Sequence, residues 1–249
     1  RSWELIVVFD VPNSPERDED IAKIKKWYPF ADLHFTWDSH GAGAARNIGL
    51  EFANAPLTLF LDADDRLTPT ALAELLEAYS KTGFYTYCDS TVDHGNGSFV
   101  TLPSMEYNQG EWQNQHSITA LIETQVAKEI RFDETLASWE DWDFFLRMQI
   151  RGYCGIRVAK PLLIYDMTSG SRRKSAVINE ETTELGKAIL EKFKSQYGDY
   201  FTGVKTMSSC CGGSADIILA AKRAMNPAAF ANMDTNPAVE GSVVRMVFI

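Results

Sequence analysis

Residues 58–69, TLFLDADDRLTP, run from a continuous apolar segment into a turn that contains three aspartates. The run at 57–61, apolar except for Thr58, has the length of a strand, and such a run is typical of a strand covered on both faces, as in a parallel sheet. The aspartates that follow, Asp62, Asp64 and Asp65, repel one another and resist desolvation. They therefore either occupy a solvated turn or bind a cation.

Strand patterns and helix patterns alternate on both sides of this stretch. Strands are predicted over 4–10, 33–37, 57–62 and 84–92, and helices over 21–28, 40–55 and 68–83. In the last helix we expect Thr68 to cap the start and Gly83 to end it. The alternation predicts an α/β fold with a Rossmann-like, mostly parallel sheet flanked by helices.

The pattern changes in the second half of the chain. The predicted elements there are a helix over 138–150, a strand pair within 156–166 and an amphipathic helix near 177–197. From about residue 201 the chain becomes small, Ala-rich and punctuated by Pro and Asn, and SVVRMVFI at 242–249 has a strand pattern. We therefore predict one domain over 1–200 and a helical or irregular extension over 201–249, whose role the sequence does not indicate.

Composition excludes several classes of protein. The net charge of −10 argues against a broad nucleic-acid or anionic-membrane surface. No stretch approaches the ~20 consecutive apolar residues of a membrane span. The four cysteines show neither a CxxC pair nor zinc-ligand spacing, which favours a reduced, cytoplasmic protein. Cys210 and Cys211 are expected to be free thiols, with a metal or disulfide role as the alternative.

Carboxylates at strand ends and a glycine-led helix indicate an anionic ligand and a metal. Asp10 and Asp62 both follow predicted parallel strands, so they are expected to face one crevice, where carboxylates suit Mg²⁺ or Mn²⁺. GAGAARNIG at 41–49 would present backbone N–H groups and a positive helix end to an anion, and Arg46 could contact a diphosphate. Alternatively, the glycines only make a turn and Arg46 is a surface charge.

The segment SWEDWDFFLRM, residues 138–148, offers a candidate general base. One interpretation is structural, because Ser138 and Asp141 have capping-box spacing and acids are favoured at a helix start. The functional interpretation makes Asp141 a base. The helix start would then lower its pKa, so that it accepts the proton late, as the acceptor oxygen forms its bond.

Taken in order, these motifs resemble the inverting family 2 glycosyltransferases of the GT-A fold. The resemblance rests on SWELIVVFD, GAGAARNIG, FLDADDRLTP and RFDETLASWEDWDFFLRM, and it covers roughly residues 2–166. It implies transfer of a sugar from a nucleotide-diphosphate sugar, most simply a UDP-sugar, to a glycan, protein or other hydroxyl acceptor.

The resemblance also implies roles for individual residues. Asp10 would contact the nucleobase, Asp62 would lie near the ribose and the metal, and Asp64 would ligate Mn²⁺ or Mg²⁺. Asp141 would deprotonate the acceptor hydroxyl. The metal would neutralise the charge that develops on the departing diphosphate.

This sequence departs from the family pattern in two places. Family members have a strand and a helix before the strand that lies here at residue 4, so we expect either a trimmed chain or another segment in that place, with 242–249 as the candidate. Phe9 precedes Asp10 where the family commonly has another Asp, which would alter the nucleotide contacts. The tail also resembles a short module found in some phage-encoded proteins.

Two other functions are compatible with parts of the pattern. The missing first strand would suit a catalytically silent nucleotide-sugar or glycan-binding module. The aspartates would suit a metal-dependent phosphohydrolase, but no nucleophile or phosphate-loop pattern accompanies them. A metal-dependent glycosyltransferase is the hypothesis that uses all four motifs.

Overall fold

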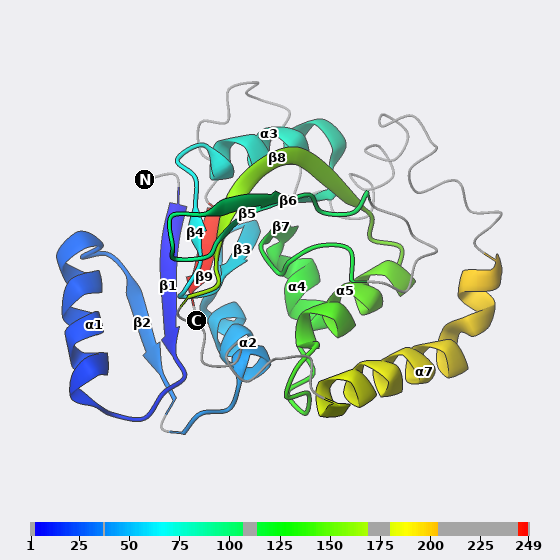
Figure 1. Cartoon of the computed structure of the whole chain (residues 1–249), viewed down its shortest axis with the longest axis horizontal. Coiled ribbons are helices and arrows are strands. Elements are labelled where there is room, and N and C mark those ends of the chain that lie inside the picture. Colours follow the sequence, from blue (N-terminus) through cyan, green and yellow to red (C-terminus); the bar gives the residue numbers. More distant parts are fainter. Residues whose placement is uncertain (1–2, 37, 107–113, 169–179, 204–243, 249) are drawn as a thin grey trace.

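The computed structural model describes residues 3–36, 38–106, 114–168, 180–203 and 244–248 of the 249-residue chain (Figure 1). The helices are α1 (Pro15–Trp27), α2 (Ala42–Phe52), α3 (Ala71–Thr82), α4 (Thr124–Ile130), α5 (Glu140–Ile150) and α7 (Glu180–Gly203). The strands are β1 (Trp3–Phe9), β2 (Asp32–Phe35), β3 (Leu57–Leu61), β4 (Arg66–Leu67), β5 (Tyr85–Asp93), β6 (Phe99–Leu102), β7 (Ala120–Glu123), β8 (Gly155–Asp166) and β9 (Val244–Phe248).

All the described strands belong to one sheet in the order β2-β1-β9-β3-β7-β5-β8-β4, with β6 paired to β5. Neighbouring strands from β2 to β3 are parallel. β7 runs antiparallel to both β3 and β5. β4 pairs antiparallel with β8, and β6 pairs antiparallel with β5. β5 and β8 also pair in parallel. The predicted α/β class is therefore confirmed, with parallel pairs both among β2, β1, β9 and β3 and between β5 and β8.

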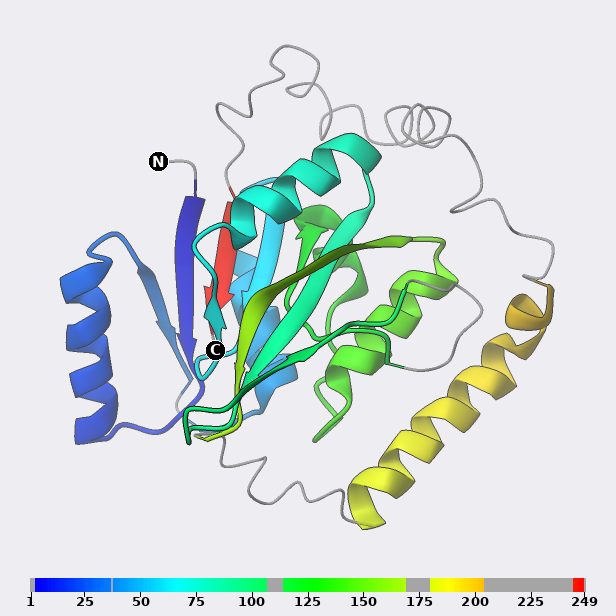
Figure 2. The same cartoon turned by 45° about the horizontal axis from the view of Figure 1, so that its top comes forward.

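The apolar run that opened the sequence analysis is buried on both faces. Every residue of β3 is buried, and successive side chains of a strand point to opposite faces. Phe60 packs in the cluster with Phe132 and Phe144, whereas Leu59 and Leu61 pack in the cluster that includes residues of α3. Helices cover both faces, with α3 on one side and α2, α4 and α5 on the other (Figures 1 and 2).

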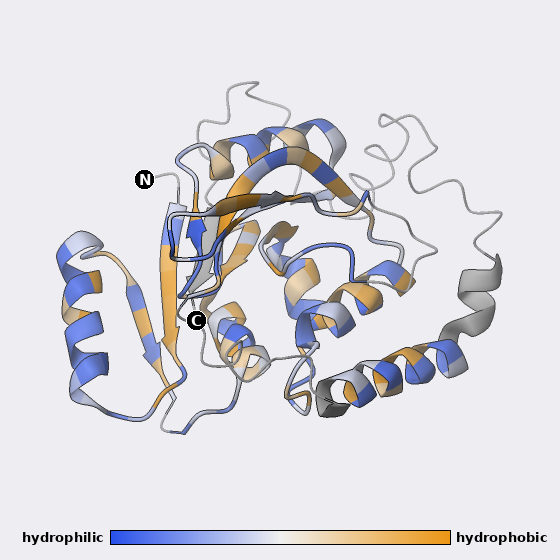
Figure 3. Ribbon diagram, viewed as in Figure 1, coloured by the Kyte–Doolittle hydropathy of each residue, from blue (hydrophilic) through white to orange (hydrophobic). Residues whose placement is uncertain are grey.

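The edge of the sheet beside β2 is covered more lightly. α1 lies outside β2 and contains no buried residue, and its surface is mostly hydrophilic (Figure 3). Ser14 caps its first turn by accepting a hydrogen bond from the Arg17 N–H at 3.2 Å. Sequence periodicity placed this helix six residues too late, because its polar first turns lack the apolar stripe of a packed helix.

The strand pattern near the end of the chain forms β9, which lies between β1 and β3 and is parallel to both. Met246 is in register with Leu5 on one side and with Leu59 on the other. β9 therefore fills a central place in the sheet, and the strand ends that precede Asp10 and Asp62 are both next to it. The division of the chain at residue 200 stays a prediction.

Three predicted details are wrong. Thr68 does not cap α3, because its hydroxyl accepts no hydrogen bond from the described residues and the helix begins only at Ala71, after Thr70. The Thr68 N–H donates to the Leu162 carbonyl of β8. Gly83 does end α3, with a φ of 66°. The predicted strand pair at 156–166 is instead one long strand, β8, which pairs along β5 through register shifts. The predicted Ser138 cap of α5 is treated with the site below.

The remaining sequence predictions concern cysteines and membrane spans. Cys88 and Cys154 are buried thiols, whereas Cys210 and Cys211 lie outside the described residues. Among the helices in the described part of the chain, none is long and apolar enough to cross a bilayer.

Candidate active site

The three aspartates after β3 lie close together. Asp62, Asp64 and Asp65 each offer a carboxylate oxygen, and these oxygens lie within 4.8 Å of one another. The turn is held by a hydrogen bond from Asp65 N to Asp62 O, and the Asp65 carboxylate accepts the Asp166 N–H at the end of β8 at 3.0 Å. Closely spaced carboxylate oxygens are the ligands that a hard divalent cation prefers, so the cluster fits Mg²⁺ or Mn²⁺.

Arg46 joins this turn to α5. Its guanidinium is only 2% exposed and donates to Asp62 at 2.7 Å and to Glu140 at 2.9 Å. The guanidinium also lies 5.3 Å from the centre of the Phe132 ring. Burial lowers the pKa of Arg46, but Asp62 and Glu140 raise it by more, so the side chain stays charged. The alternative that Arg46 is a surface charge is therefore wrong.

Residues on either side of Arg46 hold α2 against the segment that leads to α5. Gly43 of α2 lies so close to this segment that an added Cβ would be 3.3 Å from the Phe132 Cβ. Asn47 is buried; its amide donates to Phe132 O at 2.9 Å and to Glu134 at 2.7 Å, and its oxygen accepts the Phe132 N–H at 2.8 Å. The AARN motif thus positions the start of α5 relative to the aspartate turn.

We expect Asn47→Ala to lower the free energy of unfolding by about 2 kcal/mol, because it leaves the Phe132 N–H and C=O without their partner. Urea unfolding followed by circular dichroism measures this. The matched control is Asn54→Ala, whose exposed amide bonds only to the nearby Phe52 carbonyl and whose loss should cost little. Equal losses for the two variants would contradict the role given to Asn47.

Asp141 lies one residue beyond Glu140, in the first turn of α5. The helix begins after Trp139, which has a left-handed φ of 63° and makes no side-chain cap, so the predicted capping box with Ser138 is wrong. One Asp141 oxygen accepts the Trp142 N–H at 2.7 Å, and the other accepts the Asn114 amide at 3.4 Å.

The predicted low pKa of Asp141 is also wrong. Burial, and to a smaller extent the neighbouring Glu140 carboxylate, raise the pKa of Asp141 to about 6. Arg46, the Trp142 N–H and Asn114 oppose this rise but do not cancel it. Desolvation therefore outweighs the helix start. At pH 7 the group is mainly ionised, and it is a stronger base than an ordinary aspartate.

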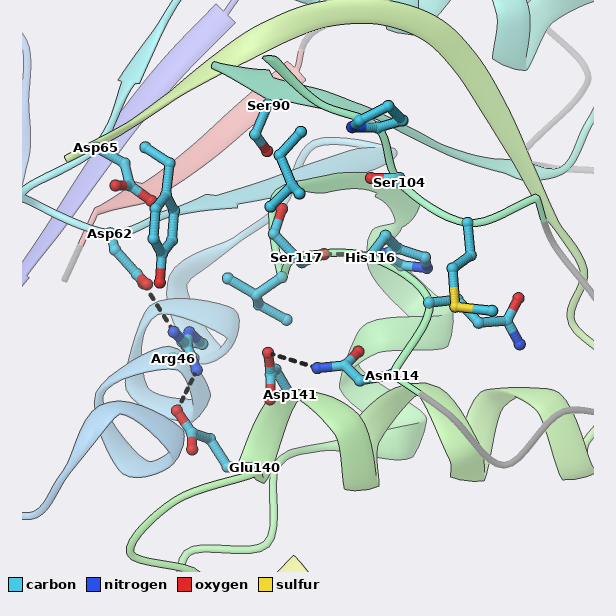
Figure 4. Close-up of a pocket in the computed structure, with 16 residues that line it drawn as sticks. Arg46, Asp62, Asp65, Ser90, Ser104, Asn114, His116, Ser117, Glu140 and Asp141 are labelled. Carbon is cyan, nitrogen blue, oxygen red and sulfur yellow. Dashed lines mark hydrogen bonds and ion pairs between the residues drawn. The ribbon is translucent and has the colours of Figure 1, made fainter. Parts of the chain in front are cut away.

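One cavity of about 420 Å³ brings these groups together (Figure 4). Arg46, Asp62 and Asp141 line it, as the sequence predicted for one site, and Asp65 and Glu140 line it as well. Asp64 belongs to the carboxylate cluster beside the cavity but is not among its lining residues.

Asp10 does not line the cavity and is engaged with the backbone instead. Its carboxylate accepts the Thr36 hydroxyl at 2.8 Å, the His40 N–H at 2.9 Å and the Gly41 N–H at 2.7 Å. Gly41 is the residue before α2 and has a φ of 93°, a conformation that favours glycine. Asp10 therefore fixes the loop that leads into α2.

Sequence reasoning missed the roles of Glu140 and Asn114. His116, which also lines the cavity, stacks on Tyr87 with ring centres 3.9 Å apart, and burial lowers its pKa to about 4. Its Nδ1 faces the Ser117 carbonyl at 2.8 Å, so this nitrogen carries the proton of the neutral ring. The contact of Asn114 with Asp141 had no sequence signal, because it joins residues 27 positions apart.

Comparison with solved structures identifies the fold of this protein. The chain superposes on S. aureus TarS residues 1–349 with a TM-score of 0.52 and 20% identity, covering 66% of this chain and 51% of that one. It superposes on GalNAc-T7 with a TM-score of 0.53 and 17% identity, covering 66% and 37%. The GT-A fold is thereby confirmed.

Sequence comparison identifies the family. Residues 1–138 match the family described as Glycosyl transferase family 2, and the chain belongs to this family. It is 30% identical over 153 residues to the amylovoran biosynthesis glycosyltransferase AmsB of Erwinia amylovora, covering 54% of this chain and 50% of AmsB. It is also 30% identical over 159 residues to a teichoic acid poly(glycerol phosphate) polymerase of Staphylococcus epidermidis, covering 59% and 22%. The chain thus spans half or less of the length of these relatives.

Proposed function

We propose that this protein moves a sugar from a UDP-sugar to an acceptor hydroxyl, with inversion at the anomeric carbon and dependence on a divalent metal. The observation that carries the proposal is the shared cavity. Asp62, from the carboxylate cluster, and Asp141, a partly desolvated carboxylate, both line it, and Arg46 and Glu140 join the two. The family membership supports the same reaction class.

The donor is proposed to bind at the ends of β1 and β3. Asp62 and Asp64 would hold Mn²⁺ or Mg²⁺, which when bound would neutralise charge on the diphosphate. Arg46 lines the cavity beside Asp62 and would add positive charge near the diphosphate. Asp10 is proposed to border the nucleobase while holding the 36–41 loop in place. GalNAc-T7, which shares the fold, was solved with UDP, GalNAc and Mn²⁺, and this supports the choice of donor and metal.

Asp141 is proposed as the general base. It would take the proton of the acceptor hydroxyl while that oxygen bonds to the anomeric carbon, and the bond from this carbon to the diphosphate would break with its electrons leaving on the phosphate oxygen. Attack opposite the leaving group inverts the configuration. The Trp142 N–H and the Asn114 amide hold the carboxylate in one orientation for this step.

Titration calorimetry with a panel of UDP-sugars tests the donor and the metal together. We expect binding in the presence of Mn²⁺ and none after chelation with EDTA, because the carboxylate cluster would otherwise repel a diphosphate. Binding that is indifferent to Mn²⁺ would refute the metal-dependent proposal. Metal-dependent binding without transfer to any acceptor and without hydrolysis of the sugar nucleotide would favour the silent binding module.

A further inference from the structure

The cavity has a charged side and an uncharged side (Figure 4). Arg46 and the carboxylates of Asp62, Asp65, Glu140 and Asp141 form the charged side. Opposite them, the polar lining side chains are Ser90, Ser104, Asn114, Gln115 and Ser117. His116 on this side is neutral near pH 7, because burial lowers its pKa to about 4. We call the segments 102–105 and 114–118 the uncharged wall.

The uncharged wall is held in place before any ligand arrives. Ser104 N donates to Asp89 at 2.9 Å, and Met105 N donates to the Gln115 carbonyl at 2.9 Å, which ties the two segments together. The Tyr87 hydroxyl donates to the Met105 carbonyl at 2.8 Å. A wall with its backbone bonds already made loses little freedom when a ligand binds, so its chemistry can select the ligand.

The uncharged wall itself contains no Lys or Arg. The sequence contains neither Lys nor Arg between Gly83 and Ala127. The Arg157 guanidinium donates from Nε and Nη2 to the Asp89 carboxylate, at 2.7 and 2.8 Å, and from Nη1 to Glu106. Proteins bind phosphate groups mainly through Arg and Lys, so an anionic ligand would find no charged partner among the described residues of the wall.

The uncharged wall is the side from which an acceptor would reach Asp141. A general base must lie within hydrogen-bond reach of the hydroxyl that it deprotonates, and Asp141 faces Asn114 of the wall at 3.4 Å. The Asp62 end of the cavity is the end proposed for the donor. A ligand lying between Asn114, Ser104 and Asp141 would therefore be the acceptor.

We infer, on the basis of the proposed function, that the acceptor is an uncharged glycan whose hydroxyl groups bond to the Ser, Asn and Gln side chains of the wall. A polyol phosphate chain, the kind of polymer in the name of one relative, would bring phosphates toward a cavity with four carboxylates and one guanidinium. The wall has no cation that would offset the repulsion between these phosphates and carboxylates.

The first experiment compares acceptors with the whole chain, Mn²⁺ and each UDP-sugar of the panel. The measurement is the release of UDP when neutral di- and trisaccharides or poly(glycerol phosphate) are added. Neutral glycans are expected to raise the release more than the anionic polymer does. The inference is overturned if poly(glycerol phosphate) raises it as much or more. If the protein in that case still binds UDP in a Mn²⁺-dependent way, the proposed function stands. If it binds no UDP in the presence of Mn²⁺, the proposed function itself is refuted.

The second experiment places a cation on the wall. Met105 is 39% exposed and contributes its backbone to the wall's hydrogen bonds, so Met105→Lys adds charge while keeping those bonds. The ratio of UDP release with poly(glycerol phosphate) to release with a neutral glycan should rise about fivefold or more at low salt and return in high salt. Met105→Gln is the uncharged control of similar length. Equal ratios in the two variants would show that the acceptor does not lie along this wall.

Discussion

Asp141→Asn is expected to reduce turnover by about 10²- to 10⁴-fold while leaving donor affinity unchanged. The amide has nearly the shape of the carboxylate but cannot accept the acceptor proton. Its oxygen can still accept the Trp142 N–H, so the first turn of α5 should keep its position. Calorimetry with the donor and Mn²⁺, combined with the rate of sugar transfer, separates the two effects. A variant that lost donor binding and turnover together would count against the role of base.

The pH dependence provides an independent check on the same residue. Because burial and Glu140 raise the pKa of Asp141 to about 6, protonation below that pH should remove the base, and the rate should fall as the pH drops through 6. Arg46 faces the group and limits the rise. The acid limb should disappear in Asp141→Asn. An acid limb that survives the substitution would assign it to another group.

Asp143→Asn is the matched control on the same helix. Asp143 is buried, and its carboxylate pairs with Arg147 one turn later, away from the residues that line the cavity. Its substitution should lower stability, because it leaves the partly buried charge of Arg147 less well paired, but the folded protein should keep its turnover. Comparison of the turnover and the stability of the Asp141→Asn and Asp143→Asn variants therefore separates an effect on the reaction from an effect on folding.

Asp64→Ala is expected to abolish metal-dependent donor binding, with affinity reduced by more than about 100-fold, since loss of a residue that only supports a ligand already costs 10- to 100-fold. The Asp64 carboxylate is one of the three that lie within 4.8 Å of one another. Calorimetry with a UDP-sugar at fixed Mn²⁺ measures the loss. Asp20→Ala, on the exposed helix α1, removes the same charge far from the cluster and should bind as the parent does. Equal donor affinity in Asp64→Ala and the parent would refute the ligand assignment.

Much of the fold could be predicted because its signals are local. Apolar residues on both faces of the run 57–61 predict a strand that is covered on both sides, and β3 is buried throughout. Gly83 ends α3 because its left-handed φ is accessible to glycine at little cost. The start of α3 was misplaced because Thr68 is bound by β8, a partner that lies far away in the sequence. Local capping rules contain no information about such a partner.

The candidate site divides in the same way. The residue types and their order along the chain were sufficient to indicate metal ligands in Asp62 and Asp64, a diphosphate contact in Arg46 and a base in Asp141. The reason is that the charge of a carboxylate or a guanidinium group follows from the residue type alone. The basicity of Asp141 was decided only by tertiary structure, since it depends on how far packing removes the carboxylate from water and how near Glu140 and Arg46 approach. The uncharged wall was likewise decided by packing, because hydrogen bonds between distant segments bring Ser104, Met105 and Gln115 to the same cavity.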